Sequence, residues 1–213
     1  MRSESQVRAA GDQSDVVPSL YDRMHLRIIS IVHDTLYQLF VDPYRLLGAA
    51  GLRKGEVALE VGCGPGFFTI PAAEIVGPQG HLYTIDNNPA AVERVKKMVE
   101  EEGLANVDAY YADAAATGLA EESLDIAVLF GILRSLKDLD RVLREMHRVL
   151  NGHGVLAVEK SSWSESRLLQ AFTRAGLFRF ARKEGRVYQF DKESGSTAKA
   201  FTNHAMSAES VGR

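Results

Sequence analysis

The stretch that decides the fold reads Val57-Ala58-Leu59-Glu60-Val61-Gly62-Cys63-Gly64-Pro65-Gly66-Phe67-Phe68-Thr69. Its first half is a short apolar run that ends in an acid, which is typical of a buried parallel strand. Its second half has glycine at alternate positions and leads into an apolar segment of helical period. Because glycine permits close backbone approach and the first helical N–H groups have no partner inside the helix, this unit predicts a site for an anionic or polar ligand.

The spacing of the glycines separates two kinds of nucleotide site. A dinucleotide-binding loop has glycine at its first, third and sixth positions. Counted from Gly62, the third position is Gly64, but the sixth is Phe67, and the third glycine comes one place early at Gly66. The spacing therefore argues against a dinucleotide loop.

Length and composition indicate one globular domain of ordinary size. The chain has 213 residues, of which 46% are hydrophobic and 25% charged. Its net charge of −3 gives no general attraction to phosphate backbones, so the sequence has no strong nucleic-acid signal, although local basic patches can exist. The single cysteine, Cys63, excludes a disulfide framework and a cysteine-rich metal site, and no metal is expected.

No segment has the pattern of a signal peptide or a membrane span. Residues 1–15 are polar, and charged or polar side chains interrupt the apolar residues between Leu26 and Leu47. A cytoplasmic location is the expectation. The composition predicts disorder in residues 1–17 and again in residues 192–213.

Residues 18–51 are expected to form a helical cap before the main domain. A helical period begins near Leu20, and a second short helix from Tyr44 to Ala50 ends at Gly51. Two interpretations stay open. The helices either cover one edge of the domain, or form a lid over a substrate pocket lined by Tyr21, His25, His33, Tyr37 and Tyr44.

Residues 52–191 alternate between strand and helix patterns and end in a hairpin. Strands are expected at 57–61, 81–86, 107–111, 124–130, 155–159, 177–184 and 186–191, with a turn at 151–154 before the fifth. Helices are expected at 67–76, 89–102, 138–150 and from a capping box at Ser162–Glu165 to Gly176. This order predicts an α/β fold of Rossmann-like type: a seven-stranded, mostly parallel sheet with helices on both faces and an antiparallel C-terminal hairpin.

Two carboxylates fall where strands end. Asp86 closes the second strand about 20 residues after the glycine loop, where a carboxylate accepts ribose hydroxyls in doubly wound nucleotide sites. Asp113 follows the third strand, at the same edge of the sheet.

Residues 57–191 resemble the class I S-adenosylmethionine (SAM)-dependent methyltransferases, and especially the broad group that includes those of ubiquinone and menaquinone biosynthesis. The resemblance rests on an ordered set of motifs: Glu60-Val61-Gly62-Cys63-Gly64-Pro65-Gly66, Asp86, Ala112-Asp113-Ala114, the strand from Asp125, Leu143-Arg144-Glu145-Met146-His147-Arg148-Val149-Leu150 with Gly152-His153-Gly154, and the terminal hairpin.

The resemblance implies a SAM site and assigns roles to its residues. Glu60 would orient the methionyl amine, Asp86 would accept the ribose hydroxyls, Asp113 would contact the adenine amine, and Phe130 with Gly131 would border the sulfonium. The full expected cofactor set is Glu60, Gly62, Cys63, Gly64, Gly66, Asp86, Asn87, Asp113, Ala114 and Phe130. Cys63 is interpreted as a small residue that fits the loop and not as a nucleophile.

Two departures from related enzymes limit the choice of acceptor. Leu133-Arg134-Ser135 stands where small-molecule methyltransferases of this kind often carry histidine, and the Asn-Pro-Pro-Tyr motif of amine methylation is absent. Arsenic methylation needs several cysteines, and the chain has one.

The implied chemistry is in-line displacement of a methyl group from the sulfonium by an unidentified, small-molecule acceptor. Arg134 would suit an anionic acceptor by bidentate pairing. The candidates near the acceptor are Arg134, Lys160, Trp163, Tyr21 and His25. The rival interpretations are a non-catalytic SAM-binding protein and a nicotinamide-dependent oxidoreductase. The oligomeric state is not predicted.

Overall fold

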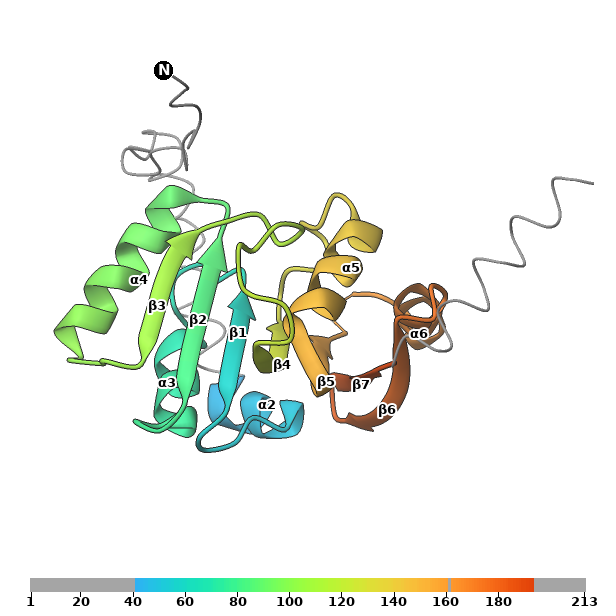
Figure 1. The fold of residues 1–213 in the computed structure, drawn as a ribbon, viewed down its shortest axis with the longest axis horizontal. Coiled ribbons are helices and arrows are strands. Elements are labelled where there is room, and N and C mark those ends of the chain that lie inside the picture. Colours follow the sequence, from blue (N-terminus) through green and yellow to red (C-terminus); the bar gives the residue numbers. More distant parts are fainter. Residues whose placement is uncertain (1–40, 161, 194–213) are drawn as a thin grey trace, which may run out of the picture.

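A computed structural model describes residues 41–160 and 162–193. Their strands are β1 (Val57–Val61), β2 (His81–Asp86), β3 (Val107–Tyr111), β4 (Leu124–Leu129), β5 (Leu150–Glu159), β6 (Phe178–Glu184) and β7 (Val187–Lys192). These strands form one sheet in the order β3-β2-β1-β4-β5-β7-β6 (Figure 1). Strands β1 to β5 run parallel, and β7 runs antiparallel to both β5 and β6. The expected seven-stranded sheet with its C-terminal hairpin is confirmed.

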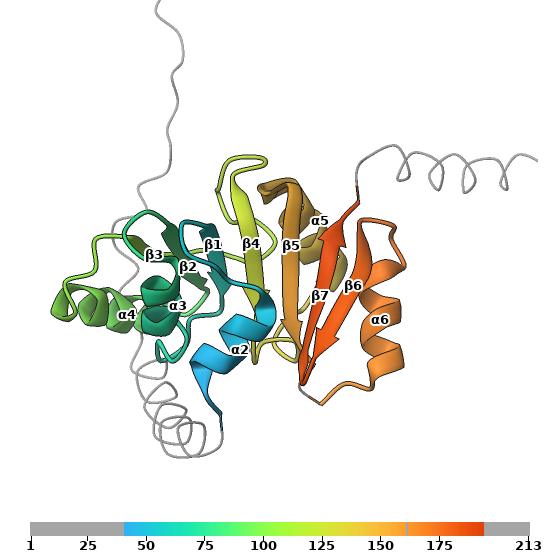
Figure 2. The same cartoon turned by 90° about the horizontal axis from the view of Figure 1, so that it is seen from below.

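Helices cover both faces of this sheet. They are α2 (Pro43–Ala50), α3 (Thr69–Val76), α4 (Pro89–Glu101), α5 (Leu139–Val149) and α6 (Glu165–Thr173). Helices α2, α3 and α4 lie on one side, α5 lies on the other, and α6 flanks β6 (Figure 2).

Alternation along the strands divides the core between the two faces. Leu59 and Val61 of β1 point toward α5 and α6, where Leu143 and Phe172 join the same buried cluster. Ala58, the neighbour of Leu59, points to the opposite face and belongs to the cluster under α2 and α3. Because both faces of β1 are covered, its sequence is apolar throughout, apart from Glu60.

Parallel pairing places the loops after β1 and β2 side by side. The register runs from Val57 opposite His81 to Val61 opposite Ile85. The next residues, Gly62 after β1 and Asp86 at the end of β2, therefore lie side by side at the carboxyl edge of the sheet. Open α/β sheets bind ligands at this edge.

Side chains cap the helices that frame this edge. Asn88 precedes Pro89 at the start of α4, and its side chain accepts a hydrogen bond from the Ala90 N–H at 2.9 Å. Asp138 caps α5 in the same way through the Arg141 N–H at 3.1 Å. Pro71 lies in the first turn of α3, where its missing N–H has no intrahelical partner to lose. The predicted start of α4 at Asn88-Pro89 is confirmed.

Helix α3 begins at Thr69, two residues later than predicted. The glycine loop first closes as a turn, in which the Gly66 N–H donates to the Cys63 carbonyl at 2.9 Å. The predicted capping box at Ser162 is also wrong, because Ser164 is the N-cap of α6 and accepts from the Arg167 N–H at 3.2 Å.

The turn predicted at 151–154 is wrong as well. Strand β5 begins at Leu150, which pairs with Leu124, and a shift of register follows before Ile126 meets Val155. The irregular start of β5 contains Gly152 and Gly154. A Cβ on Gly154 would stand 2.8 Å from the Leu150 Cβ, so only glycine fits this curl of the strand.

The expectations for residues 1–17, for most of the helical cap and for residues 194–213 lie outside the described residues. The disordered tail was predicted from residue 192, but Lys192 is the last residue of β7. Of the cap, α2 is described, and it packs on α3 and β7 as part of the core. The Gln189 side chain of β7 donates to the Ala49 carbonyl at 2.7 Å and fixes the end of α2. The described helices include none with the length and apolar character needed to cross a bilayer.

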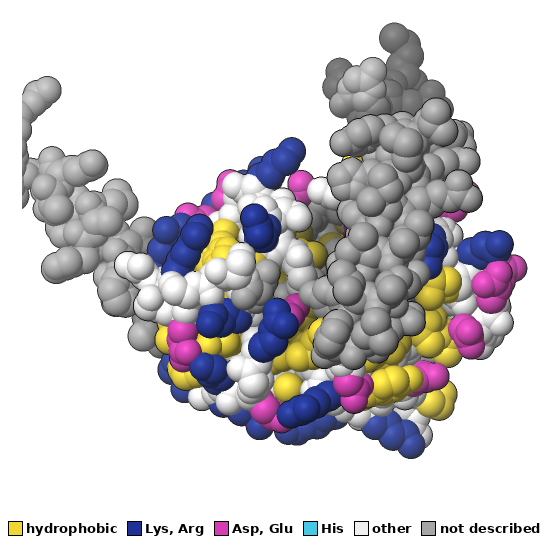
Figure 3. Space-filling view, turned by 180° about the vertical axis from the view of Figure 1, so that it is seen from behind, with side chains coloured by type: hydrophobic (Ala, Val, Ile, Leu, Met, Phe, Trp, Pro, Cys, Tyr) yellow, Lys and Arg dark blue, Asp and Glu magenta, His cyan; other side chains and the backbone are white. Residues whose placement is uncertain are grey.

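Charges are mixed on the face seen from behind. Lysine and arginine side chains lie there among aspartate and glutamate side chains over the described surface (Figure 3). The visible described part of this face therefore offers no extended basic patch to a phosphate backbone.

Candidate functional site

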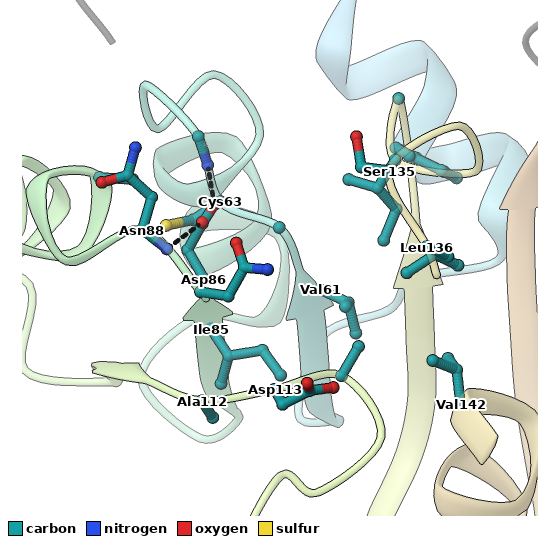
Figure 4. Close-up of a pocket in the computed structure, with 18 of the residues that line it drawn as sticks. Val61, Cys63, Ile85, Asp86, Asn88, Ala112, Asp113, Ser135, Leu136 and Val142 are labelled. Atoms are coloured by element: carbon teal, nitrogen blue, oxygen red, sulfur yellow. Dashed lines mark hydrogen bonds between the residues drawn. The ribbon is translucent and has the colours of Figure 1, made fainter. Parts of the chain in front are cut away.

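A cavity of about 700 Å³ opens at the carboxyl edge of the sheet, above β1, β2 and β4. This volume is within the range of small-molecule sites, roughly 300–1,000 Å³. One wall carries Cys63, Asp86 and Asn88, and the facing wall carries Ser135 and Val142 (Figure 4). The cavity therefore lies between the glycine loop and the segment that follows β4.

The glycine loop forms the floor of the cavity through backbone geometry that only glycine adopts easily. The Gly62 N–H donates to the Ile85 carbonyl at 2.7 Å, and Gly62 has φ +81°. A Cβ on Gly62 would stand 2.4 Å from Cγ2 of Ile132. Gly64, with φ +49°, would place its Cβ in open space, so this part of the loop leaves room for a ligand.

Asp86 joins the loop to the end of β2. Its carboxylate accepts hydrogen bonds from the Gly64 N–H at 2.9 Å and from the Asn88 N–H at 2.8 Å. Burial raises the pKa of Asp86 above its ordinary value, although these backbone N–H groups act in the opposite direction. A carboxylate with both oxygens at the cavity wall can accept further hydrogen bonds from hydroxyl groups of a ligand.

Glu60 lies beneath the loop and does not line the cavity. Its side chain is 3% exposed, and Oε2 accepts from the hydroxyls of Thr69 at 2.6 Å and Thr84 at 2.7 Å. These bonds tie β1 to α3 and β2. Oε1 has no hydrogen-bond partner in the described chain, and burial raises the pKa of Glu60.

The loop after β3 supplies another carboxylate to the cavity, that of Asp113. Asp113 Oδ1 accepts from the Ala115 N–H at 2.7 Å, which folds the loop back on itself. Thr117, four residues later, donates to Glu145 of α5 through its backbone N–H at 2.9 Å and its hydroxyl at 2.6 Å. Arg148 also donates to Glu145, and these donors lower the pKa of Glu145 to about 2. Glu145 thereby anchors the loop that carries Asp113.

Most residues of the facing wall were not predicted from the sequence. It is formed by the segment after β4 and by the first turn of α5. Its lining residues are Gly131, Ile132, Ser135, Leu136, Lys137, Asp138, Arg141 and Val142, and of these only Gly131 was expected. The position directly after a parallel strand was a usable signal for the segment, but the turn of α5 comes to the cavity only through the path of the chain.

Most of the expected cofactor residues come together in this cavity. Its lining includes Gly62, Cys63, Gly64, Asp86, Asn87, Asp113, Ala114 and Phe130. Gly66 lies outside it, on a second cavity of about 620 Å³. A Cβ on Gly66 would stand 3.0 Å from the Met98 sulfur, so this glycine serves the packing of α4.

The expected acceptor residues do not gather there. Arg134 is exposed and does not line the cavity, and neither do Lys160 and Trp163. Trp163 instead lies under the Arg167 guanidinium, 4.2 Å from its ring centre. Tyr21 and His25, with the other cap residues His33 and Tyr37, lie outside the described residues.

Cys63 has the properties of a packing residue. Its side chain is buried, and burial raises the pKa of the thiol well above its ordinary value, which opposes formation of a thiolate nucleophile. Within residues 41–160 and 162–193, no group of three or more histidine, cysteine, aspartate or glutamate side chains could hold a metal ion.

Comparison with known proteins supports one family. Residues 52–201 match the model of a family described as a methyltransferase domain. Over 111 residues the chain is 33% identical to a demethylmenaquinone methyltransferase of Geobacillus stearothermophilus, a match that covers 52% of this chain and 47% of that enzyme. The chain thus spans about half the length of the curated relatives it matches.

Solved structures share the fold. A SAM-dependent methyltransferase from Aquifex aeolicus matches 80% of this chain and 97% of its own with a TM-score of 0.67 and 22% identity. The [4+2]-cyclase SpnF matches 79% of this chain and 75% of its own with a TM-score of 0.58 and 20% identity. The fold alone therefore does not fix the reaction. The family match over residues 52–201, together with the strand order β3-β2-β1-β4-β5-β7-β6, shows that the chain belongs to the methyltransferase domain family with the class I fold.

Proposed function

We propose that this protein is a SAM-dependent methyltransferase that acts on a small-molecule acceptor. The observation that carries the proposal is the convergence of the glycine loop, Asp86 and Asp113 on one cavity at the carboxyl edge of the sheet. Family membership and the similarity to demethylmenaquinone methyltransferases support it. A cytoplasmic location stays a prediction.

The residues of the cavity fit SAM by chemistry. Asp86 has carboxylate oxygens for ribose hydroxyls, and Asp113 has an oxygen for an amine donor. A Cβ on Gly64 or Gly131 would meet no atom within 4 Å, so both backbones leave space beside them. Carboxylates on this wall also suit a ligand that carries a sulfonium and an ammonium group.

The chain's own residues would chiefly bind, orient and exclude water. When bound, SAM would supply a methyl group carried on a sulfonium: a lone pair of the acceptor would form the new bond to this methyl carbon, and the electron pair of the S–CH₃ bond would stay on sulfur. Phe130 and Ile132 would keep water from the reacting atoms. The backbone of the glycine loop would hold the cofactor in position. Alignment of the two partners is then the main contribution of the protein to the rate.

Isothermal titration with SAM and S-adenosylhomocysteine (SAH) tests the cofactor assignment. We expect binding by the wild type and a loss of about 10–100-fold in Asp86→Asn, because a charged acceptor of hydrogen bonds is removed. Asp108→Asn is the matched control, since Asp108 is exposed on β3 and does not line the cavity.

Failure of folded wild-type protein to bind either ligand would overturn the proposed function. NAD is the next ligand to titrate in that case. Binding of SAM without turnover of any acceptor would instead support a non-catalytic SAM-binding protein.

A further inference from the structure

The proposed cofactor contacts leave half of the cavity unassigned. The expected SAM residues lie in the glycine loop, at the ends of β2 and β3, and at Phe130. The remaining wall runs from Ser135 to Asp138 and continues with Arg141 and Val142 of α5. Figure 4 places Ser135, Leu136 and Val142 across the cavity from Asp86. An acceptor would therefore meet this wall while the cofactor occupies the other.

The wall formed by residues 135–138 with Arg141 and Val142 is the acceptor wall, and its two cations have no acidic partner among the described residues. Lys137 and Arg141 both line the cavity and are exposed, and within the described chain neither side chain forms an ion pair or hydrogen bond.

The acids beside these cations are already engaged. Asp138 Oδ1 accepts from the backbone N–H of Arg141 as the cap of α5. Asp140 is paired with Arg174, the C-cap residue of α6, at 2.5 Å and 2.6 Å from its two oxygens. Among the described residues, neither acid is therefore paired with the side chain of Lys137 or Arg141, and the two positive charges are open to a ligand in this part of the chain.

Beside Ser135 and Asp138, this wall also has apolar side chains. Ile132, Leu136 and Val142 face the same cavity as the two cations. The combination suits a ligand that has an apolar body and an anionic group at one end.

The described lining contains no histidine, tyrosine or glutamate, and its carboxylates are Asp86 and Asp113, which the proposed function gives to the cofactor, and Asp138, which caps α5. An acceptor that enters as an anion has already lost its proton, so the transfer needs no base from the protein. The sulfonium of the cofactor would also attract such an acceptor. The apolar lining and the two cations of the described cavity point to the same kind of molecule.

We propose that Lys137 and Arg141 bind the anionic oxygen of the methyl acceptor, a small molecule with an acidic hydroxyl or carboxyl group on an apolar body. This inference rests on the proposed function and names the substrate class of the same site. It gives to Lys137 and Arg141 the anion-binding role that the sequence suggested for Arg134.

The test uses matched acids and amides on full-length protein saturated with SAH. The probes are benzoate, salicylate and 1-naphthoate, each beside its neutral amide, observed by saturation-transfer NMR and titrated where binding is seen. We expect the acids to bind and the amides to bind at least ten-fold more weakly. Arg141→Gln and Lys137→Gln should each weaken acid binding about ten-fold and leave amide binding unchanged.

Arg144→Gln is the matched control, because Arg144 is exposed on the same helix but does not line the cavity. It should bind the acids as the wild type does. Equal binding of acids and amides, binding of neither, or an unchanged affinity in Arg141→Gln and Lys137→Gln would overturn the inference. Titration of SAH into the same protein separates this failure from that of the proposed function, since only the latter abolishes SAH binding.

Discussion

The carboxylate of Asp86 accepts a hydrogen bond of 2.9 Å from the backbone N–H of Gly64, 22 residues earlier in the chain. This bond links the end of β2 to the glycine loop after β1, across the cavity floor. Asp86 therefore has two tasks in the proposed mechanism: it shapes the loop, and it presents an oxygen to the ligand. A loss of SAM binding in Asp86→Asn would combine both effects.

Gly62 should be the glycine least tolerant of a side chain in this loop. Gly62→Ala places a methyl group at φ +81° and 2.4 Å from Cγ2 of Ile132, so we expect a loss of about 2–4 kcal/mol in unfolding free energy. Urea unfolding measures it. Gly118→Ala is the control, with φ +77° and open space at its Cβ, and should lose only about 1–2 kcal/mol.

A double-mutant cycle separates steric contact from backbone strain at Gly62. Adding Ile132→Ala to Gly62→Ala should recover part of the loss, because the methyl group introduced at this position then has room. An additive double variant would show that the contact with Ile132 contributes nothing.

Glu60 should make stability fall as the pH rises. Its pKa is raised by burial in the folded protein, so its contribution is fully present below the unfolded value near 4.5 and is lost as the pH rises through the higher folded pKa. In Glu60→Gln this pH dependence disappears. We expect the stability of the wild type relative to Glu60→Gln to decrease with pH above 4.5, measured by urea unfolding at a series of pH values. A difference that stays constant or grows with pH would contradict the raised pKa of the buried carboxyl.

Glu145 should have the opposite pH dependence. Its pKa is lowered from 4.5 to about 2 by Arg148 and Thr117, so its stabilisation is present above pH 4.5 and is lost as the pH falls toward 2. The shift corresponds to at most about 3 kcal/mol, and we expect Glu145→Gln to lose about 1–2 kcal/mol at pH 7.

The same variant tests the anchoring of the Asp113 loop. Because Glu145 holds Thr117, Glu145→Gln should also weaken SAM binding several-fold, although its own side chain does not line the cavity. Isothermal titration measures this effect, with the exposed Glu121→Gln as control. Unchanged affinity in a destabilised Glu145→Gln would restrict Glu145 to a structural role.

The sequence determined the order of elements and one wall of the site. Local patterns carry this information. Apart from Glu60, Val57 to Val61 is apolar because both faces of β1 are covered, and Asn88-Pro89 is a local signal for the start of a helix. Asp86 and Asp113 could be placed at the same edge because parallel strands bring their carboxyl ends together.

Only the tertiary structure decided the other wall and the function of each polar group there. Arg134 lies in the segment between β4 and α5, but the path of this segment brings Lys137 and Arg141 to the cavity instead. Glu60 lies beside the glycines in sequence, yet the alternation of β1 points it beneath the loop, at Thr69 and Thr84. The direction of a side chain depends on register and on contacts between distant segments, such as Thr117 with Glu145, and these contacts leave no local pattern in the sequence.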